Sequence, residues 1–208
     1  MVTLTPVQST VGASRPRVEV LGVFGAGKTS LARRLETSAV ELLLEDHELN
    51  PFWGDSRLTE ITGYLAYDLA FLLQHVQLLA SWALSKTTAT VAVCDWSLLT
   101  DKLWASLRLG ADFGVYEAAH ENMRMRLGPP LGYVFLDEPT DVICSRIIRR
   151  GRPPESKLLS QIEGARKGVK SIIAHLPRNQ VITVRDQIDY SMVQKHIFQW
   201  QRNAHAHS

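Results

Sequence analysis

The sequence predicts an α/β protein, built on a parallel sheet of about five strands with helices on both of its faces. Short apolar segments, several of them rich in β-branched residues, alternate with longer segments of helical periodicity along most of the 208 residues. Clusters of glycine, proline and asparagine separate many of these segments. This alternation is typical of βαβ units, in which a helix crosses back over the sheet after each strand.

The strands and helices can be assigned in order along the chain. The segment 88–94 is the clearest strand, because it is both apolar and β-branched. Asn50-Pro51 and Gly128-Pro129-Pro130 interrupt the chain between elements. Strands are expected at 17–23, 39–44, 88–94, 132–136 and 180–184. Helices are expected at 30–37, about 61–85, 98–109, 115–127, 140–150, 155–175 and 190–201.

The chain length fits a single domain. We expect a flexible N-terminal lead-in over 1–16, one domain over 17–202 and a frayed tail over 203–208. The lead-in is rich in Ser, Thr, Val and Pro and has no apolar core of the signal-peptide type.

Composition excludes several classes of protein. The formal net charge of +2 does not favour a nucleic-acid partner. Cys94 and Cys144 form no CxxC pair, so neither a disulfide framework nor a zinc site is indicated, and a cytoplasmic, reducing location is expected. The segment 64–84 is apolar and about 20 residues long, but it contains an aspartate and three polar side chains. We therefore expect a buried helix and no membrane span.

The most informative motif follows the first strand. Residues 22–29 read Gly-Val-Phe-Gly-Ala-Gly-Lys-Thr, which fits the phosphate-binding pattern G-x-x-x-x-G-K-[ST] between a strand and a helix. Lys28 would reach the β- and γ-phosphates of ATP, and the Thr29 hydroxyl would bind Mg²⁺. The other residues expected to hold the nucleotide are Gly22, Gly25, Ala26, Gly27 and Ser30. The motif predicts a P-loop NTPase or kinase fold.

A short arginine-rich segment favours a small kinase within this class. Arg146, Arg149, Arg150 and Arg152 surround Gly151. Arginines on a lid can stabilise the negative charge of a transferring phosphoryl group. A solvated basic helix end and, more weakly, a nucleic-acid contact are the alternatives. No N-K-x-D segment for reading guanine is found, which argues against a GTPase.

Two carboxylates follow predicted strands. Glu45 and Asp95 are expected at the carboxyl edge of the sheet, where open α/β sheets bind ligands. Glu45 is the candidate base for the acceptor hydroxyl, and Asp95 the candidate ligand of Mg²⁺ or its water shell. Alternatively, each carboxylate caps the segment that follows it.

Taken together, these motifs resemble those of the deoxyribonucleoside kinase family, a branch of the thymidylate-kinase-like P-loop kinases, over about residues 18–193. Glu45 with Asn50-Pro51-Phe52 is similar to the family's E-P-x-x-x-N-P-[FY]. Asp95-x-Ser97 with Asp101 resembles D-R-S-x-x-x-D. The most specific match is the lid, R-x-x-x-R-G-R-x-x-E, which spans residues 146–155.

The resemblance implies roles for further residues. Arg146, Arg150 and Arg152 would contact the transferring phosphate, and Arg150 would also help to bind ATP. Phe52 and Glu155 would face the acceptor, with Glu155 near its sugar. The segment 181–190 would contact the adenine of ATP. The family also implies a homodimer packed through helices.

Three positions depart from the family on the acceptor side. Trp96 replaces the Arg of D-R-S, and Arg57 takes the place of a sugar-contacting Tyr. Counting from Asn50 without gaps places Asp68 where the family has a base-reading Gln, whereas a shifted register would offer Gln74. A carboxylate only accepts hydrogen bonds, so Asp68 favours an acceptor with N–H or O–H donors, or a cation. We expect a substrate other than a standard deoxynucleoside.

Two other functions stay open from the sequence. One is a kinase of another small alcohol or of a nucleoside monophosphate, for which Arg57 and Arg124 are the available basic residues. The other is a nucleotide-binding accessory protein without catalysis, which Trp96 favours and the intact phosphate-side residues oppose.

Overall fold

A five-stranded parallel sheet forms the centre of the molecule. The computed structural model describes residues 15–149, 156–185 and 188–206. The strands lie in the order β2-β3-β1-β4-β5, and every pair of neighbours is parallel. Their bounds are β1 Arg17–Leu21, β2 Val40–Leu43, β3 Val91–Cys94, β4 Gly132–Leu136 and β5 Val181–Val184. The predicted fold class is confirmed.

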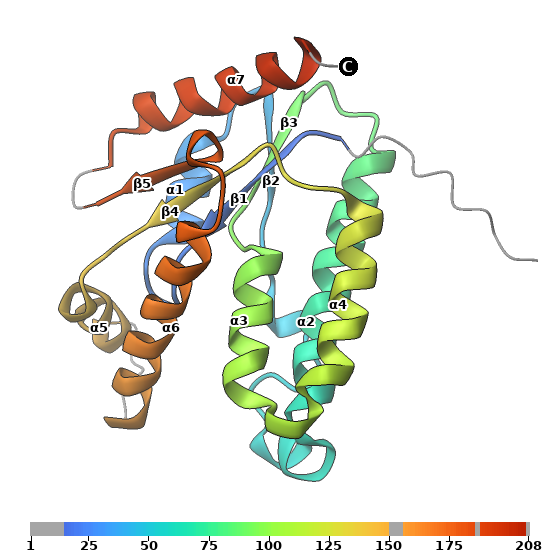
Figure 1. Cartoon of the computed structure of the whole chain (residues 1–208), viewed down its shortest axis with the longest axis vertical. Helices are drawn as coiled ribbons and strands as arrows, with labels where there is room; N and C mark the ends of the chain where they lie inside the picture. Colours follow the sequence, from blue (N-terminus) through green and yellow to red (C-terminus); the bar gives the residue numbers. More distant parts are fainter. Residues whose placement is uncertain (1–14, 150–155, 186–187, 207–208) are drawn as a thin grey trace, which may run out of the picture.

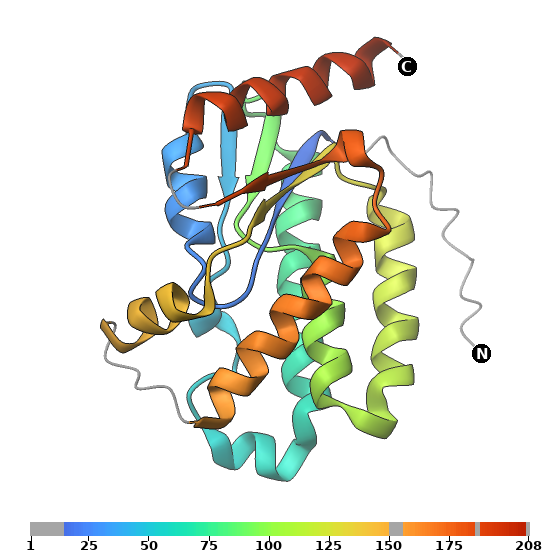
Figure 2. The same ribbon diagram turned by 60° about the vertical axis from the view of Figure 1, so that its left-hand side comes forward.

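Helices cover both faces of this sheet (Figures 1 and 2). One face carries α1 and α7, which contact each other. On the other face α2, α3 and α4 pack side by side, and α6 contacts α3 and α5. The bounds are α1 Lys28–Leu35, α2 Ser56–Leu84, α3 Leu98–Arg108, α4 Phe113–Leu127, α5 Thr140–Arg149, α6 Ser156–Ala174 and α7 Tyr190–Ala206.

Strand β3 shows how the sequence pattern specifies both cores. Val91 and Val93 belong to the core cluster that includes α1 and α7, whereas Ala92 and Cys94 belong to the cluster under α2, α3 and α4. Successive side chains of a strand point to opposite faces, so an unbroken apolar strand is what a sheet covered on both faces requires.

Some element ends differ from the prediction. Helix α2 begins five residues earlier than expected, because the Asp55 carboxylate accepts from the Arg57 backbone N–H and caps the helix. Gly63, with φ 70° and ψ 173°, interrupts this helix near its start. Helix α7 continues to Ala206, beyond the helix end at residue 201 that the sequence predicts.

Arg15, from the predicted flexible lead-in, is held in place. Its guanidinium lies 3.7 Å from the centre of the Trp82 ring and donates a 2.9 Å hydrogen bond to the Ser85 carbonyl. Residues 1–14 lie outside the described residues. Among the described helices, none has both the length and the apolarity that crossing a membrane requires.

Gly132→Ala tests the packing of α7 on the sheet. A Cβ at this position would lie 2.7 Å from the Trp200 ring, so we expect a loss of about 1–3 kcal/mol in the free energy of unfolding. Urea denaturation measures the change. Gly114→Ala is the control, because a Cβ on that helical glycine meets no atom within 4 Å and should stabilise the protein slightly. Equal stability of the Gly132→Ala variant and the parent would contradict this packing.

Candidate active site

The phosphate loop joins β1 to α1 and has the conformation that its glycines allow. Gly25 and Gly27 have φ angles of 82° and 102°, which side chains with a Cβ rarely adopt. A Cβ on Gly25 would also lie only 3.0 Å from Cγ1 of Ile147 on α5. Gly27 occupies the N-cap of α1, so the positive end of this helix faces the loop. The loop is therefore built to bind an anion.

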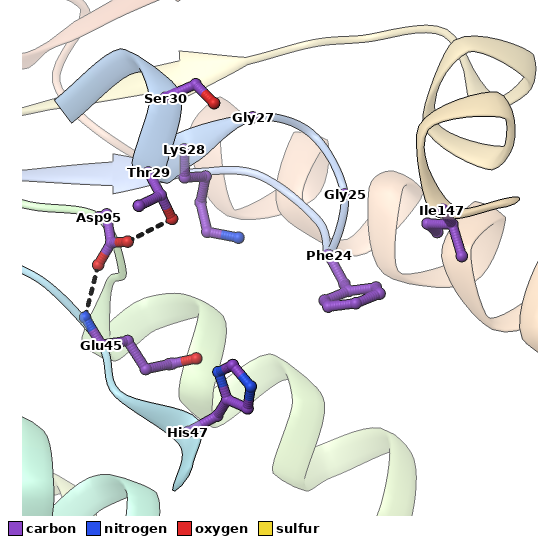
Figure 3. A pocket seen from close by; sticks show the side chains of 10 residues that line it. All are labelled: Phe24, Gly25, Gly27, Lys28, Thr29, Ser30, Glu45, His47, Asp95 and Ile147. Atoms are coloured by element: carbon purple, nitrogen blue, oxygen red, sulfur yellow. Dashed lines mark hydrogen bonds between the residues drawn. The ribbon is translucent and has the colours of Figure 1, made fainter. Parts of the chain in front are cut away.

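A carboxylate ties this loop to the neighbouring strands. Asp95 follows β3, and its Oδ2 accepts a 2.5 Å hydrogen bond from the Thr29 hydroxyl (Figure 3). Its Oδ1 accepts from the Glu45 backbone N–H at 2.8 Å. Asp95 thus fixes the start of α1 and the segment after β2, and it brings together three of the residues for which the sequence predicted catalytic or metal-binding roles.

The oxygen atoms of Thr29 and Asp95 fit a magnesium ion. Mg²⁺ is usually held by one or two protein oxygens together with substrate phosphates and waters. In the described part of the chain, no group of three or more His, Cys, Asp or Glu side chains gathers into a denser metal site. Burial raises the pKa of Asp95 above its ordinary value, although the Thr29 hydrogen bond and the charge of Lys28 oppose this rise.

A cavity of about 320 Å³ opens over the loop. Lys28 extends into it (Figure 3). Its ammonium donates a 3.3 Å hydrogen bond to the Val23 carbonyl. Ala26 is buried beneath the loop and does not line this cavity. The lining residues are Phe24, Gly25, Gly27, Lys28, Thr29, Ser30, Glu45, His47, Asp95 and Ile147.

The first arginine of the predicted lid contacts the phosphate loop. The Arg146 guanidinium, on α5, donates hydrogen bonds of 2.8 Å to the Ala26 carbonyl and 3.1 Å to Oε1 of the buried Glu138. This anchored guanidinium lies beside Gly27. Arg149 is exposed at the end of α5, and the remaining predicted lid residues, Arg150, Arg152 and Glu155, lie outside the described residues.

A second cavity, of about 360 Å³, lies between the loop and helices α2, α3 and α4. Gly22, Lys28 and Glu45 line it, and Lys28 and Glu45 line the first cavity as well. Its walls are rich in aromatic rings, from Phe24, Trp53, Tyr67, Phe71, Trp96, Trp104 and Tyr116. Such walls suit a flat ring, whose hydroxyl-bearing part would then lie beside Glu45.

An ion pair forms the polar part of this cavity. Asp68 is 4% exposed, and its carboxylate pairs with the Arg108 guanidinium from α3. Burial raises the pKa of Asp68 above its ordinary value, even though Arg108 opposes the rise. The sequence predicted a lone carboxylate, whereas the structure offers acceptor oxygens and guanidinium N–H donors side by side.

A buried histidine supplies charge next to the candidate base. His75 is fully buried, and its Nε2 and Nδ1 lie 3.1 Å from Glu45 Oε2 and 2.6 Å from Asp101 Oδ2. Burial opposes a charge on the imidazole. The charge and hydrogen bond of Asp101, followed by those of Glu45, outweigh this effect and raise the pKa of His75 to about 9.

The same contact acts on Glu45, whose side chain is 36% exposed. Burial raises the pKa of this carboxyl, but the hydrogen bond and charge of His75, with smaller contributions from Lys28 and His47, bring it below its ordinary value. Glu45 is therefore ionised at neutral pH and can accept a hydrogen bond from a hydroxyl group.

Trp96 is 2% exposed and lines the second cavity. Its ring is stacked on His75 with centroids 3.9 Å apart and planes 1° apart. Among the described residues, its indole N–H has no hydrogen-bond partner, although the nitrogen is buried. A buried donor of this kind costs about 1–3 kcal/mol unless a ligand or water satisfies it.

Three residues considered for the acceptor site lie elsewhere. Arg57 pairs with Asp55, its side chain is 82% exposed and it does not line the second cavity, so the structure does not bring it to the other predicted acceptor residues. Phe52 does not line the cavity, and the neighbouring Trp53 does. The Gln74 amide donates a 2.6 Å hydrogen bond to the Asp46 carbonyl and does not line the second cavity. Of the two α2 residues considered for the base-reading position, Asp68 is therefore the one that faces this cavity.

The sequence reasoning missed His75 and Arg108 as site residues. A signal for both was present in the helical spacing. Asp68 and His75 are seven residues apart on α2, and Asp101 and Arg108 are seven apart on α3, so each pair shares a helix face. The two faces meet at the cavity, which Asp68, Asp101 and Arg108 line, and His75 is buried behind it.

Comparisons with known proteins agree with this architecture. No protein-family model and no curated protein matches the sequence. Solved structures of deoxyadenosine kinase from M. mycoides do match. The structure with products dCMP and a flexible dCDP bound has a TM-score of 0.66 at 18% identity, over 90% of this chain and 99% of that chain. The structure with bound dATP has a TM-score of 0.63 at 19% identity, over 88% and 97%. The structure with bound dCTP has a TM-score of 0.60 at 18% identity, over 91% and 99%.

At this identity the comparison shows the fold. The predicted P-loop kinase fold and the resemblance of this chain to the deoxynucleoside kinases are confirmed at that level.

Asp95→Asn is expected to stabilise the ligand-free protein by about 1 kcal/mol at pH 7. The folded-state pKa of Asp95 is raised, so ionisation of this group opposes folding as the pH rises through that value. An amide avoids this cost and can still accept from the Glu45 N–H. Urea denaturation measures the change, and the gain should shrink at pH 4. The exposed Asp141→Asn is the control, with a change within about 0.5 kcal/mol. A clear loss of stability in Asp95→Asn would contradict the conclusion that ionised Asp95 opposes folding.

Proposed function

We propose that the protein is an ATP-dependent kinase that transfers the γ-phosphate to a hydroxyl of a nucleoside or nucleoside-like molecule other than a standard deoxynucleoside. The supporting observation is that Lys28 and Glu45 line both cavities. A triphosphate on the loop and an acceptor among the aromatic rings would therefore meet at these two side chains.

The residues have distinct roles in this proposal. Backbone N–H groups of the loop and Lys28 bind the β- and γ-phosphates, and Arg146 holds the loop at Ala26. Thr29 and Asp95 would hold Mg²⁺, which would help to neutralise the negative charge of the phosphates. The ionised Glu45 orients the acceptor hydroxyl and accepts its proton as the oxygen attacks the γ-phosphorus. ADP leaves with the electron pair of the broken P–O bond.

Arg150 and Arg152 are proposed to contact the transferring phosphate, and Glu155 the sugar, as the family resemblance implies. The nucleotides named for the M. mycoides structures, dATP, dCTP and dCMP, support a nucleoside-like ligand for this fold. The homodimer implied by the resemblance stays a prediction. Exposed Leu73 and Leu84 on α2 and Val115 and Met125 on the adjacent α4 are the surface that we propose for it.

The acceptor is proposed to differ from a standard deoxynucleoside because of the Asp68–Arg108 pair. A single neutral amide would present one acceptor and one donor group, whereas this pair presents carboxylate oxygens beside several N–H groups. A heteroaromatic ring with neighbouring donors and acceptors matches it. A nucleoside monophosphate is less well supported. Arg124 pairs with Glu121 on α4 and, like Arg57, does not line the cavity.

ATP consumption with pooled nucleosides, modified nucleosides and small alcohols tests the proposed reaction. We expect turnover with a subset of modified nucleosides and little with the four standard deoxynucleosides. Lys28→Ala should reduce kcat/KM by at least 10³-fold, and Glu45→Gln should reduce kcat by about 10²-fold, because they remove phosphate binding and proton acceptance.

The exposed Lys86→Ala serves as the matched control and should leave turnover unchanged. Normal turnover of unmodified deoxynucleosides would contradict the proposed specificity. Tight ATP binding without turnover of any acceptor would instead favour the accessory protein.

Substitution of the ion pair tests acceptor recognition. Because both groups face the acceptor and not the triphosphate, Asp68→Asn with Arg108→Gln should raise the acceptor KM by about tenfold or more and leave the ATP KM within twofold. The double variant is preferred, because Arg108→Gln alone leaves a buried carboxylate unpaired. Steady-state kinetics against both substrates separates the two effects. An unchanged acceptor KM would show that this pair does not recognise the substrate.

A further inference from the structure

A buried ion triad lies behind the candidate base. Both ring nitrogens of His75 face carboxylate oxygens, Glu45 Oε2 at 3.1 Å and Asp101 Oδ2 at 2.6 Å. An ionised carboxylate oxygen only accepts hydrogen bonds, so a neutral imidazole would point one lone pair at a negative oxygen. Only the doubly protonated ring satisfies both contacts. The geometry alone therefore favours a cation at His75.

Trp96 completes the surroundings of this cation. Its indole is stacked on the imidazole at 3.9 Å and is almost parallel to it. The face of an indole carries negative potential, which favours a cation placed over it. Since His75 is fully buried, the ring also keeps water from this side of the imidazole. The exchange of Arg for Trp at position 96 is thus accompanied by a different source of positive charge.

We propose that His75 is a positioning residue that carries a fixed positive charge, held by Asp101 and covered by Trp96, and that it orients the carboxylate of Glu45 toward the acceptor hydroxyl. This inference rests on the role of Glu45 in the proposed function. His75 engages Oε2 of Glu45, which leaves Oε1 for the substrate. In this arrangement the positive charge that keeps Glu45 ionised comes from the neighbouring helix α2, and Trp96, the second residue after β3, supplies a ring to cover it.

Activity should then depend on the charge of His75. This group is protonated below its folded-state pKa of about 9 and loses its proton as the pH rises through that value, so the alkaline limb of kcat should fall near pH 9. Other titratable groups contribute to the field around the triad. They are Lys28 and His47 near Glu45, Asp95 after β3, Asp68 on the same helix as His75, Arg108 on α3 and Tyr116 on α4.

The first experiment measures the charge without using activity. The full chain, labelled with ¹⁵N-histidine, is titrated by NMR, and His75→Gln assigns the His75 signals. We expect imidazolium shifts from pH 6 to about pH 8.5, and a midpoint that falls by at least one pH unit in Asp101→Asn and in Glu45→Gln. A neutral imidazole at pH 7 in the parent would overturn the proposal. A midpoint unchanged by Glu45→Gln would overturn it too, because coupling between the two groups is reciprocal.

The second experiment uses turnover and is confined to acceptors that the parent phosphorylates. His75→Gln should lower kcat by about 10- to 100-fold, leave the ATP KM within twofold and abolish the alkaline limb near pH 9. Asp101→Asn should shift that limb to lower pH. His196→Gln, a partly buried histidine on α7, is the matched control. An unchanged pH profile in His75→Gln would overturn the proposal and leave the kinase function intact.

Absence of turnover with every acceptor would refute the proposed function, and the NMR experiment would still decide the charge of His75. Trp96→Phe and Trp96→Leu extend that experiment. A ring face is retained in the first variant and lost in the second, so only Trp96→Leu should lower the His75 midpoint clearly. Equal His75 midpoints in the two variants would contradict the proposed role of Trp96.

Discussion

The Asp95 carboxylate holds the carboxyl edge of the sheet together. Its two oxygens accept from the Thr29 hydroxyl and from the Glu45 backbone, so the phosphate loop and the segment after β2 share one reference point at the end of β3. The parallel order of β2, β3 and β1 makes this contact reachable, because the carboxyl ends of all three strands lie at the same edge. The cost is a carboxylate buried where its charge is poorly solvated, and active sites often accept such a cost for geometry.

The acceptor side is organised by charge compensation between helices. On α2, Asp68 and His75 face two residues of α3, Arg108 and Asp101 respectively, so each helix contributes one carboxylate and one cation. These contacts fix the separation of α2 and α3 at the level of the cavity, while the apolar cluster beneath them supplies the packing energy. An aromatic cavity with two internal ion pairs accepts a flat polar ring more readily than a flexible or anionic molecule.

The sequence was sufficient for the fold, because the fold follows from local patterns. The apolar strands need only neighbouring residues, and the structure bears them out. The loop motif has the glycine conformations that its pattern requires, and the phosphate-binding roles of its residues stay predictions. The acceptor side could be predicted only in part. Asp68 was found by counting from Asn50, whereas Arg57 lies outside the cavity, because its guanidinium pairs with Asp55 at the start of α2. The partner of Asp68 and the charge behind Glu45 come from other helices, and pairs of this kind form only once the helices have packed.

In the proposed function, the pairing of Asp68 with Arg108 also determines how the protein treats molecules that are not its substrate. A ligand with only apolar edges would bury both ions without replacing the water that they lose. A ligand with the wrong order of donors and acceptors would place an acceptor against the Asp68 carboxylate or a donor against the Arg108 guanidinium. In either case selectivity comes from a penalty on the wrong molecule, which grows with each unmatched group. A penalty on mismatched molecules lets a small cavity select its ligand without binding that ligand tightly.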